Sequence, residues 1–303
     1  TALRYGGYRP TVFMSTGLEL GMWMSASTLL AYGMWARGTV RELRGMSTGT
    51  VFAILLGTSI LCRSTGALIL LLIGISALWI AARVESRIPI IILILIPVVY
   101  MEVRATGQWS GRDAVEIVNS WIDSNRSASL ECRLTNEDQL SAKALQRPAL
   151  GWGGWGRSRV TDETGRDICI TDGLWIIALG TSGILGLTSL TTIFILPAIR
   201  FLRTYPTSSL RDPVQAPACA LIVLLCLHMI DSLSNAMFNP IYVLAAGGLM
   251  SAIGSSWGSG SGGESEDGST RKLEAGTDPI ACLGTAERLS QLARLRVVED
   301  PKG

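Results

Sequence analysis

Charged residues are scarce in this chain. Asp, Glu, Lys and Arg make up 17% of its 303 residues, whereas roughly a quarter of a typical soluble protein is charged. The mean hydropathy is +0.37. This composition argues against a single soluble globular domain. The 26 basic and 24 acidic side chains leave a net charge of only +2, so we expect no overall attraction to nucleic acid.

Metal-binding patterns are also lacking. The six cysteines and the single histidine form no CxxC or Cys/His spacing, so we expect no metal. Cys132 and Cys169 fall in one polar segment. They could form a disulfide if that segment is extracytoplasmic, or they could be separate thiols, and both alternatives stay open. The chain starts at Thr1 without the basic and apolar layout of a signal peptide, so we expect a fragment that lacks upstream segments.

Seven apolar stretches are long enough, or nearly so, to cross a bilayer core of about 30 Å. Their apolar character is continuous, which favours helices over barrel strands. The sequence therefore predicts an all-α, polytopic transmembrane bundle of about seven helices. The stretches lie near residues 13–35, 47–62, 66–82, 88–103, 173–199, 214–230 and 240–254.

The predicted organisation has four parts. Transmembrane helices occupy residues 1–103 and 173–254, a polar loop occupies 104–172, and a flexible cytoplasmic tail occupies 255–303. The tail starts with a Gly- and Ser-rich linker that we expect to be disordered. Within it, residues 285–298 form either a short basic helix on the inner leaflet or a solvated segment.

Arginines in the short connections predict the orientation. Segments 36–46, 83–87 and 200–213 together hold eight of them, and the opposite side's short segments hold Arg4, Arg9 and Arg63. The positive-inside rule then assigns the first three segments to the cytoplasm and the 104–172 loop to the outer side. A loop of this length is usually functional.

Arginines on the outer side are candidate anion ligands. Arg4 and Arg9 flank the RYGGYRP segment just before the first apolar stretch, and Arg63 lies in a tight turn between two helices. Each could bind phosphate with its guanidinium group, or could simply anchor the chain at the membrane interface. Arg133 and Arg157 belong to a set of loop arginines that suggests an anion site, with a salt-bridged soluble cap as the alternative.

The GWGGWG element at 151–156 is a candidate glycan site. Gly151, Gly153 and Gly154 allow the backbone to approach a ligand closely. Trp152 and Trp155 offer ring faces on which sugars stack, although tryptophans near a membrane are also ordinary interface residues.

Asp172 stands at the start of the fifth apolar stretch. It is either an N-cap, worth roughly 1 kcal/mol, or a catalytic carboxylate. Gly183 and Gly186, further along the same stretch, are expected to allow close helix packing.

Polar residues inside the apolar stretches give weaker leads. Glu19 should face the bundle interior or a polar cavity. Asp231, Asn235 and Asn239 repeat every four residues and would share a face if that piece is helical. His228 precedes them, either as a hydrogen-bonded core imidazole or as a base.

The order of these motifs over residues 4–250 resembles the O-antigen ligase and polymerase superfamily of bacterial membrane proteins. RYGGYRP, SILCRSTGA and RPALGWGGWG look like the family's arginine segment, its Ser-x-Arg turn and the end of its large periplasmic loop. The family's last signature is His, a small polar residue, nine spacers, Gly, two spacers and Gly. Here Asp172 and Gly173 stand in its first two places, and Gly183 and Gly186 keep its spacing.

The resemblance implies a membrane glycosyltransferase with a GT-C-like architecture in the bacterial inner membrane. It would move a glycan from undecaprenyl diphosphate to a lipid or protein acceptor during surface polysaccharide (lipopolysaccharide) biosynthesis, with no cofactor. Arg9 and Arg63, with Arg4 and Arg133, would hold the diphosphate. Trp152, Trp155 and Arg157 would contact glycan or acceptor.

The family's histidine is thought to be the base that accepts the acceptor's proton. Since Asp172 replaces it here, three explanations remain open: Asp172 is the base, His228 reaches the site, or the protein binds the lipid-linked glycan without turning it over. A transporter or flippase is a further alternative, suggested by Glu19 and Asp231. The absence of a visible internal repeat counts against it.

Overall fold

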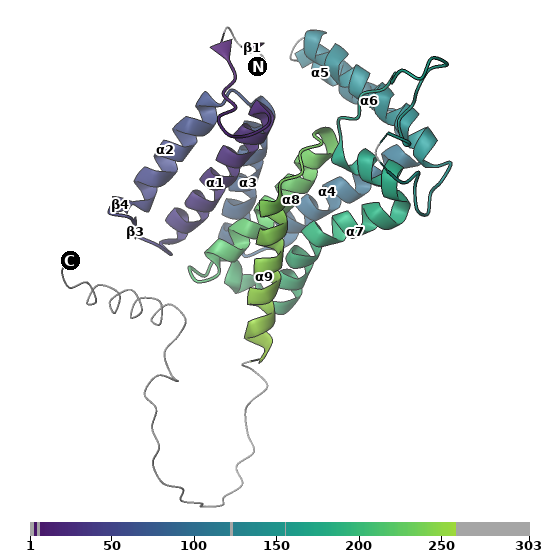
Figure 1. The fold of residues 1–303 in the computed structure, drawn as a ribbon. Coiled ribbons are helices and arrows are strands. Elements are labelled where there is room, and N and C mark those ends of the chain that lie inside the picture. Colours follow the sequence, from purple (N-terminus) through teal and green to yellow (C-terminus); the bar gives the residue numbers. More distant parts are fainter. Residues whose placement is uncertain (1–2, 5–6, 122–123, 155, 259–303) are drawn as a thin grey trace, which may run out of the picture. The chain divides into compact units, whose positions relative to one another are not determined.

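The computed structural model describes residues 3–4, 7–121, 124–154 and 156–258, and this part of the chain is mainly helical, as expected (Figure 1). A helix lies at each of the seven apolar stretches: α1 (Gly17–Arg37), α2 (Thr48–Leu61), α3 (Thr65–Val84), α4 (Ile88–Ala105), α7 (Leu174–Thr204), α8 (Ala216–Ser234) and α9 (Pro240–Gly258). The polar segment contributes α5 (Arg112–Trp121) and α6 (Ser124–Ala144). The short elements are η1 (Thr207–Leu210) and two antiparallel strand pairs, β1 (Leu3–Arg4) with β2 (Gly7–Tyr8) and β3 (Glu42–Leu43) with β4 (Met46–Ser47).

Four of the described helices, α3, α4, α7 and α8, are long and apolar enough to cross a membrane. The helices α2 and α9 are apolar but shorter in their apolar parts. Although α1 has 21 residues, its glycines, serines and Glu19 lower its mean hydropathy. Length and composition thus support a membrane protein.

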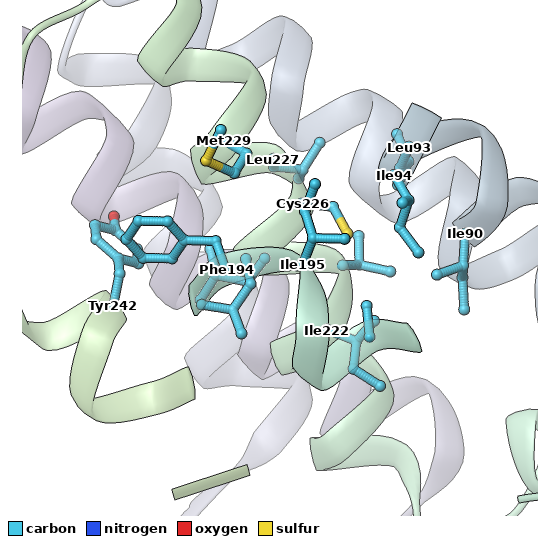
Figure 2. Packing of buried hydrophobic residues seen from close by; sticks show 14 of the residues in the cluster. Ile90, Leu93, Ile94, Phe194, Ile195, Ile222, Cys226, Leu227, Met229 and Tyr242 are labelled. Atoms are coloured by element: carbon cyan, nitrogen blue, oxygen red, sulfur yellow. The ribbon is translucent and has the colours of Figure 1, made fainter. Parts of the chain in front are cut away.

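Helix α8 is the centre of the bundle. It contacts α1, α3, α4, α7 and α9, and its Ile222, Leu225 and Cys226 side chains are fully buried. Figure 2 shows part of this core, with Tyr242 and Phe194 on one side of the view and the α4 isoleucines on the other. Because α8 packs against five neighbouring helices, it is apolar on all sides.

The three arginine-rich connections meet at one end of the bundle. Arg37, at the end of α1, donates hydrogen bonds to the carbonyl groups of Leu210 and Leu78. Arg87 donates to the Tyr205 carbonyl at 2.9 Å. The expectation that segments 36–46, 83–87 and 200–213 share a side is therefore confirmed. Which side of a membrane this is stays a prediction.

Helix α7 differs from the expected continuous helix. It is broken at Gly183, whose φ of 65° and ψ of −162° are not helical. This conformation is essentially restricted to glycine. The prediction that Gly183 serves helix packing is therefore wrong: it marks the break. Gly186 follows one turn later, where a Cβ atom would meet the Ser182 side chain of its own helix.

The end of α8 also corrects an expectation. The helix ends at Ser234, and Asn235 has an extended backbone conformation. Asp231, Asn235 and Asn239 therefore do not share one helical face. In the predicted tail, residues 255–258 belong to the end of α9, while 259–303, including the 285–298 segment, lie outside the described residues.

Candidate functional site

Arg9 and Arg63 lie together at the loop end of the bundle. The Arg9 Nη2 atom donates a hydrogen bond of 3.2 Å to the carbonyl oxygen of Arg63, which stands in the turn between α2 and α3. Arg9 is 9% exposed and packs across the start of α1, where a Cβ atom on Gly17 would lie 2.2 Å from the Arg9 Cδ atom. The structure thus joins two arginines that are 54 positions apart in the sequence. Arg4 belongs to β1, and its side chain is not among those described.

Arg133 and Asp172 form a second charged pair at the same end. The Arg133 Nε atom lies 3.5 Å from Asp172 Oδ2, and the side chains are 36% and 33% exposed. Arg133 also donates a hydrogen bond of 3.0 Å to the Ser234 carbonyl. Its guanidinium therefore connects α6 to the start of α7 and to the end of α8. Ion pairs this exposed contribute little to stability. Because a third of the Asp172 side chain is exposed, it can be reached from solvent.

The N-cap interpretation of Asp172 is not supported. The N-cap residue of α7 is Gly173, with extended backbone angles, and no side chain caps the helix. Asp172 precedes it by one residue and has the Arg133 guanidinium as its partner.

Residues 148–153, which we call the strap, fill the break in α7. The amide groups of Trp152 and Gly153 donate to the carbonyl oxygens of Gly180 and Thr181, both at 2.9 Å. In return, the Ile184 amide donates to the Pro148 carbonyl at 2.7 Å. The strap thereby pairs backbone groups that a broken helix leaves without intrahelical partners, and such pairing is necessary wherever water is excluded.

Two glycines make this contact possible. A Cβ atom on Gly151 would lie 2.6 Å from the Gly183 nitrogen, and a Cβ atom on Gly183 would lie 2.4 Å from the Ala149 carbonyl oxygen. Both glycines have positive φ angles. Gly153 also has a positive φ, whereas Gly154 faces open space.

Trp152 is held by the residues that precede the strap. Its indole Nε1 donates a 2.8 Å hydrogen bond to the Lys143 carbonyl, and the Arg147 guanidinium lies 4.5 Å from the ring centroid. A cation over the ring stabilises this position and occupies one of the faces considered for sugar stacking. Arg157 is exposed, and its Nη1 atom would be 3.6 Å from a Cβ atom on Gly153. Trp155 lies outside the described residues.

An apolar groove of about 670 Å³ runs between α4 and α7, beyond the break. Met101, Leu187 and Ile195 line it, together with a threonine stripe. The hydroxyl groups of Thr188 and Thr191 bond to carbonyl groups of their own helix. These threonines therefore offer the groove a largely apolar surface.

A polar cluster that the sequence showed only as separate leads joins α1, α8 and α9. Glu19, His228, Asp231 and Asn239 line one small cavity, and Asn239 donates to Glu19 at 3.3 Å. Sequence reasoning singled out each residue but missed their convergence. One feature of the sequence could have indicated this convergence. Each of these residues is polar and belongs to an apolar stretch, where a polar side chain needs a polar partner.

Cys132 and Cys169 are free thiols in the structure. Cys132 is exposed, whereas Cys169 is buried and donates to Gln139 Oε1 at 2.8 Å. Burial raises the pKa of the Cys169 thiol, and nearby Asp167 adds to this. Within the described residues, no three His, Cys, Asp or Glu side chains are grouped so that they could hold a metal ion.

Comparison with known proteins adds no relative to this picture, because the chain matches no protein-family model and no curated protein.

Proposed function

We propose that the chain is part of a membrane glycosyltransferase of the O-antigen ligase and polymerase type. It would transfer a glycan from undecaprenyl diphosphate to an acceptor hydroxyl at the outer face of a bacterial inner membrane. In this proposal all seven apolar helices span the membrane in a GT-C-like arrangement, and residues 104–172 form the periplasmic loop.

The observation that carries the proposal is the pairing of its four motifs. The two arginine motifs are in contact through Arg9 and Arg63, and the two glycine motifs are in contact through Gly151 and Gly183. The resemblance was drawn from the order of these motifs in the sequence. Contact between these motifs supports a common function, because motifs that act in one site must lie close together.

Arg9 and Arg63 would stabilise the diphosphate leaving group. Negative charge grows on the diphosphate as the glycosyl bond breaks, and guanidinium groups fixed beforehand stabilise that charge without reorganisation. Because Arg9 is held against α1 and bonded to the backbone carbonyl of Arg63, the Arg9 guanidinium is positioned in advance, next to the turn that carries Arg63.

Asp172 would accept the proton of the acceptor hydroxyl. Its carboxylate is one-third exposed, so an acceptor can approach it. Arg133 would orient the carboxylate through their 3.5 Å ion pair while it is itself fixed by the Ser234 carbonyl. His228 is less suited to this role, because it is 2% exposed and faces a cavity of only about 10 Å³.

The groove between α4 and α7 supports a donor with a long isoprenoid chain. Its volume of about 670 Å³ and its mainly apolar lining, to which Glu102 also belongs, suit a hydrocarbon chain. The inner part of α7 up to the arginine-rich connection, residues 184–199, is roughly 24 Å long at the usual helical rise. This is close to the thickness of the hydrocarbon core, so the strap would lie near the outer edge of that core and Asp172 further outward.

Transfer from a lipid-linked donor by the purified chain in nanodiscs tests the proposal. We expect Arg9→Ala and Arg63→Ala each to lower kcat by about 10²- to 10³-fold, the usual effect of removing one preorganised donor. Arg200→Ala, at the opposite end of α7, removes the same charge and should leave the rate unchanged. Normal turnover in a folded double variant would refute the mechanism.

A noncatalytic, donor-binding role is the second candidate. The Arg133–Asp172 ion pair favours it, because the guanidinium already contacts the carboxylate oxygen that would have to accept the proton. Asp172→Asn separates the two candidates. If Asp172 is the base, this variant should bind donor normally and transfer almost nothing. If the wild-type chain binds donor and transfers to no acceptor, the binding role is supported and the transferase is not.

A further inference from the structure

His228 is enclosed by aromatic rings. Its imidazole stacks on Tyr242 with centroids 3.9 Å apart and an angle of 14° between the planes, and it meets Phe194 edge to face at 5.0 Å. Only 2% of the residue is exposed. Neither ring nitrogen has a hydrogen-bond partner among the described residues. A buried polar atom left in this way costs about 1–3 kcal/mol, so these nitrogens call for an explanation.

The ring borders a small, partly open cavity of about 10 Å³. This is close to the smallest volume that holds one water molecule, and a polar lining is the condition for such a water. The cavity is lined by Glu19, Met22, Trp23, His228, Asp231, Met237, Asn239 and Tyr242. A single water molecule in this cavity would give the imidazole a hydrogen-bond partner. The other polar side chains that line the cavity would bond to the same water molecule.

Two acidic side chains line this cavity. Glu19 accepts hydrogen bonds from Ser15 and Asn239, and Asp231 accepts one of 2.8 Å from Asn235. All of these donors are neutral, and none of the residues lining the cavity is Lys or Arg.

The facing groups come from four helices. Glu19 belongs to α1, Asp231 to α8 and Tyr242 to α9. Arg133 of α6 interacts electrostatically with Asp231 but is already paired with Asp172. Both carboxylates are half-buried, and ionised groups partly withdrawn from water are stabilised by a nearby positive charge.

We propose that this cavity is a proton-binding site, in which one water connects His228 to Asp231 and Glu19 and the imidazole takes up a proton from solvent. The proton adds to the free ring nitrogen, both nitrogens then act as donors, and no other bond changes. The stacked Tyr242 ring presents its negative face to the imidazole, which favours the cationic form. The site is independent of the proposed transferase reaction, and its test requires no glycan.

The chain offers a direct probe, because His228 is its only histidine. Labelling with ¹⁵N-histidine therefore gives one imidazole in the NMR spectrum of the full chain in nanodiscs. Between about pH 8 and pH 5, the range in which histidine usually titrates, we expect the two nitrogen signals to change from the neutral to the cationic pattern. We also expect a cross peak between the imidazole and a bound water. An imidazole that stays neutral and without water contact while the protein remains folded would overturn the proposal.

Two conservative variants test the carboxylates. Asp231→Asn and Glu19→Gln keep the side-chain shape and remove a charge, so each should move the transition to lower pH by at least about one unit. Asp113→Asn, on α5 and outside the cavity, is the matched control and should leave the transition in place. An unchanged transition in both cavity variants would contradict the proposal. A response to Na⁺ in place of pH would also contradict it, because that result would indicate a cation site.

Discussion

Replacing Gly183 with alanine should separate the strap from α7. The backbone at Gly183, with φ of 65° and ψ of −162°, lies in a region that is essentially closed to other residues. The new Cβ atom would also lie 2.4 Å from the Ala149 carbonyl oxygen. The backbone strain and the steric clash both arise where Gly183 contacts the strap. The strap therefore cannot stay in contact with α7 without keeping this strain.

The expected cost follows from these contacts. Backbone strain of this kind is worth about 1–3 kcal/mol. If the strap moves away instead, hydrogen bonds from Trp152, Gly153 and Ile184 are lost, each worth about 0.5–1.5 kcal/mol. Taking the two routes together, we expect the free energy of unfolding to fall by about 1–4 kcal/mol.

Thermal unfolding in nanodiscs, together with hydrogen exchange, measures this change. In Gly183→Ala the Tm should fall, and the Trp152 and Gly153 amides should exchange faster than in the wild-type chain. Gly247→Ala is the control, because no atom lies within 4 Å of its added Cβ. The reasoning is refuted if Gly183→Ala keeps both the wild-type Tm and the slow exchange of those two amides.

Further predictions concern the loop. Arg104 is 1% exposed and donates to Glu137 at 3.2 Å and to backbone carbonyls. Arg104→Ala should therefore destabilise the fold by about 3–5 kcal/mol, against less than about 0.5 for exposed Arg112→Ala, as chemical denaturation would show; equal losses would contradict this. A membrane-impermeant maleimide should label exposed Cys132 first. It should label Cys169 only slowly until the pH rises, since burial raises the pKa of Cys169 and the thiolate is the reactive form. Equal rates in the folded protein would contradict the burial of Cys169, and a lack of labelling of intact cells would place the loop on the inner side.

Much of the helical framework could be predicted from the sequence. Continuous apolar runs located a helix at each of the seven stretches to within about five residues, and α7, α8 and α9 each extend further than predicted. The arginines of the short connections correctly indicated which connections share an end of the bundle, as the bonds of Arg37 and Arg87 show. These features depend on local composition, which a single sequence displays directly.

The break in α7 could not be predicted in this way. Gly183 and Gly186 have a spacing that is also typical of close helix packing, and only contact with the strap distinguishes the two cases. The same holds for Glu19 and Asn239, which are 220 positions apart and meet because α1 and α9 both contact α8. Such features depend on which distant backbone or side chain supplies the missing hydrogen bond.

The strap has a consequence for biogenesis. Residues 148–153 precede α7 in the chain, yet the backbone groups of Gly180, Thr181 and Ile184 at the break have partners in this segment. Because the ribosome synthesises residues 148–153 before α7, this segment is available when α7 leaves the translocon. In the proposed orientation, export of the loop and lateral release of α7 into lipid would be a single coupled event, and a chain stalled between the two steps would expose unpaired backbone groups to hydrocarbon.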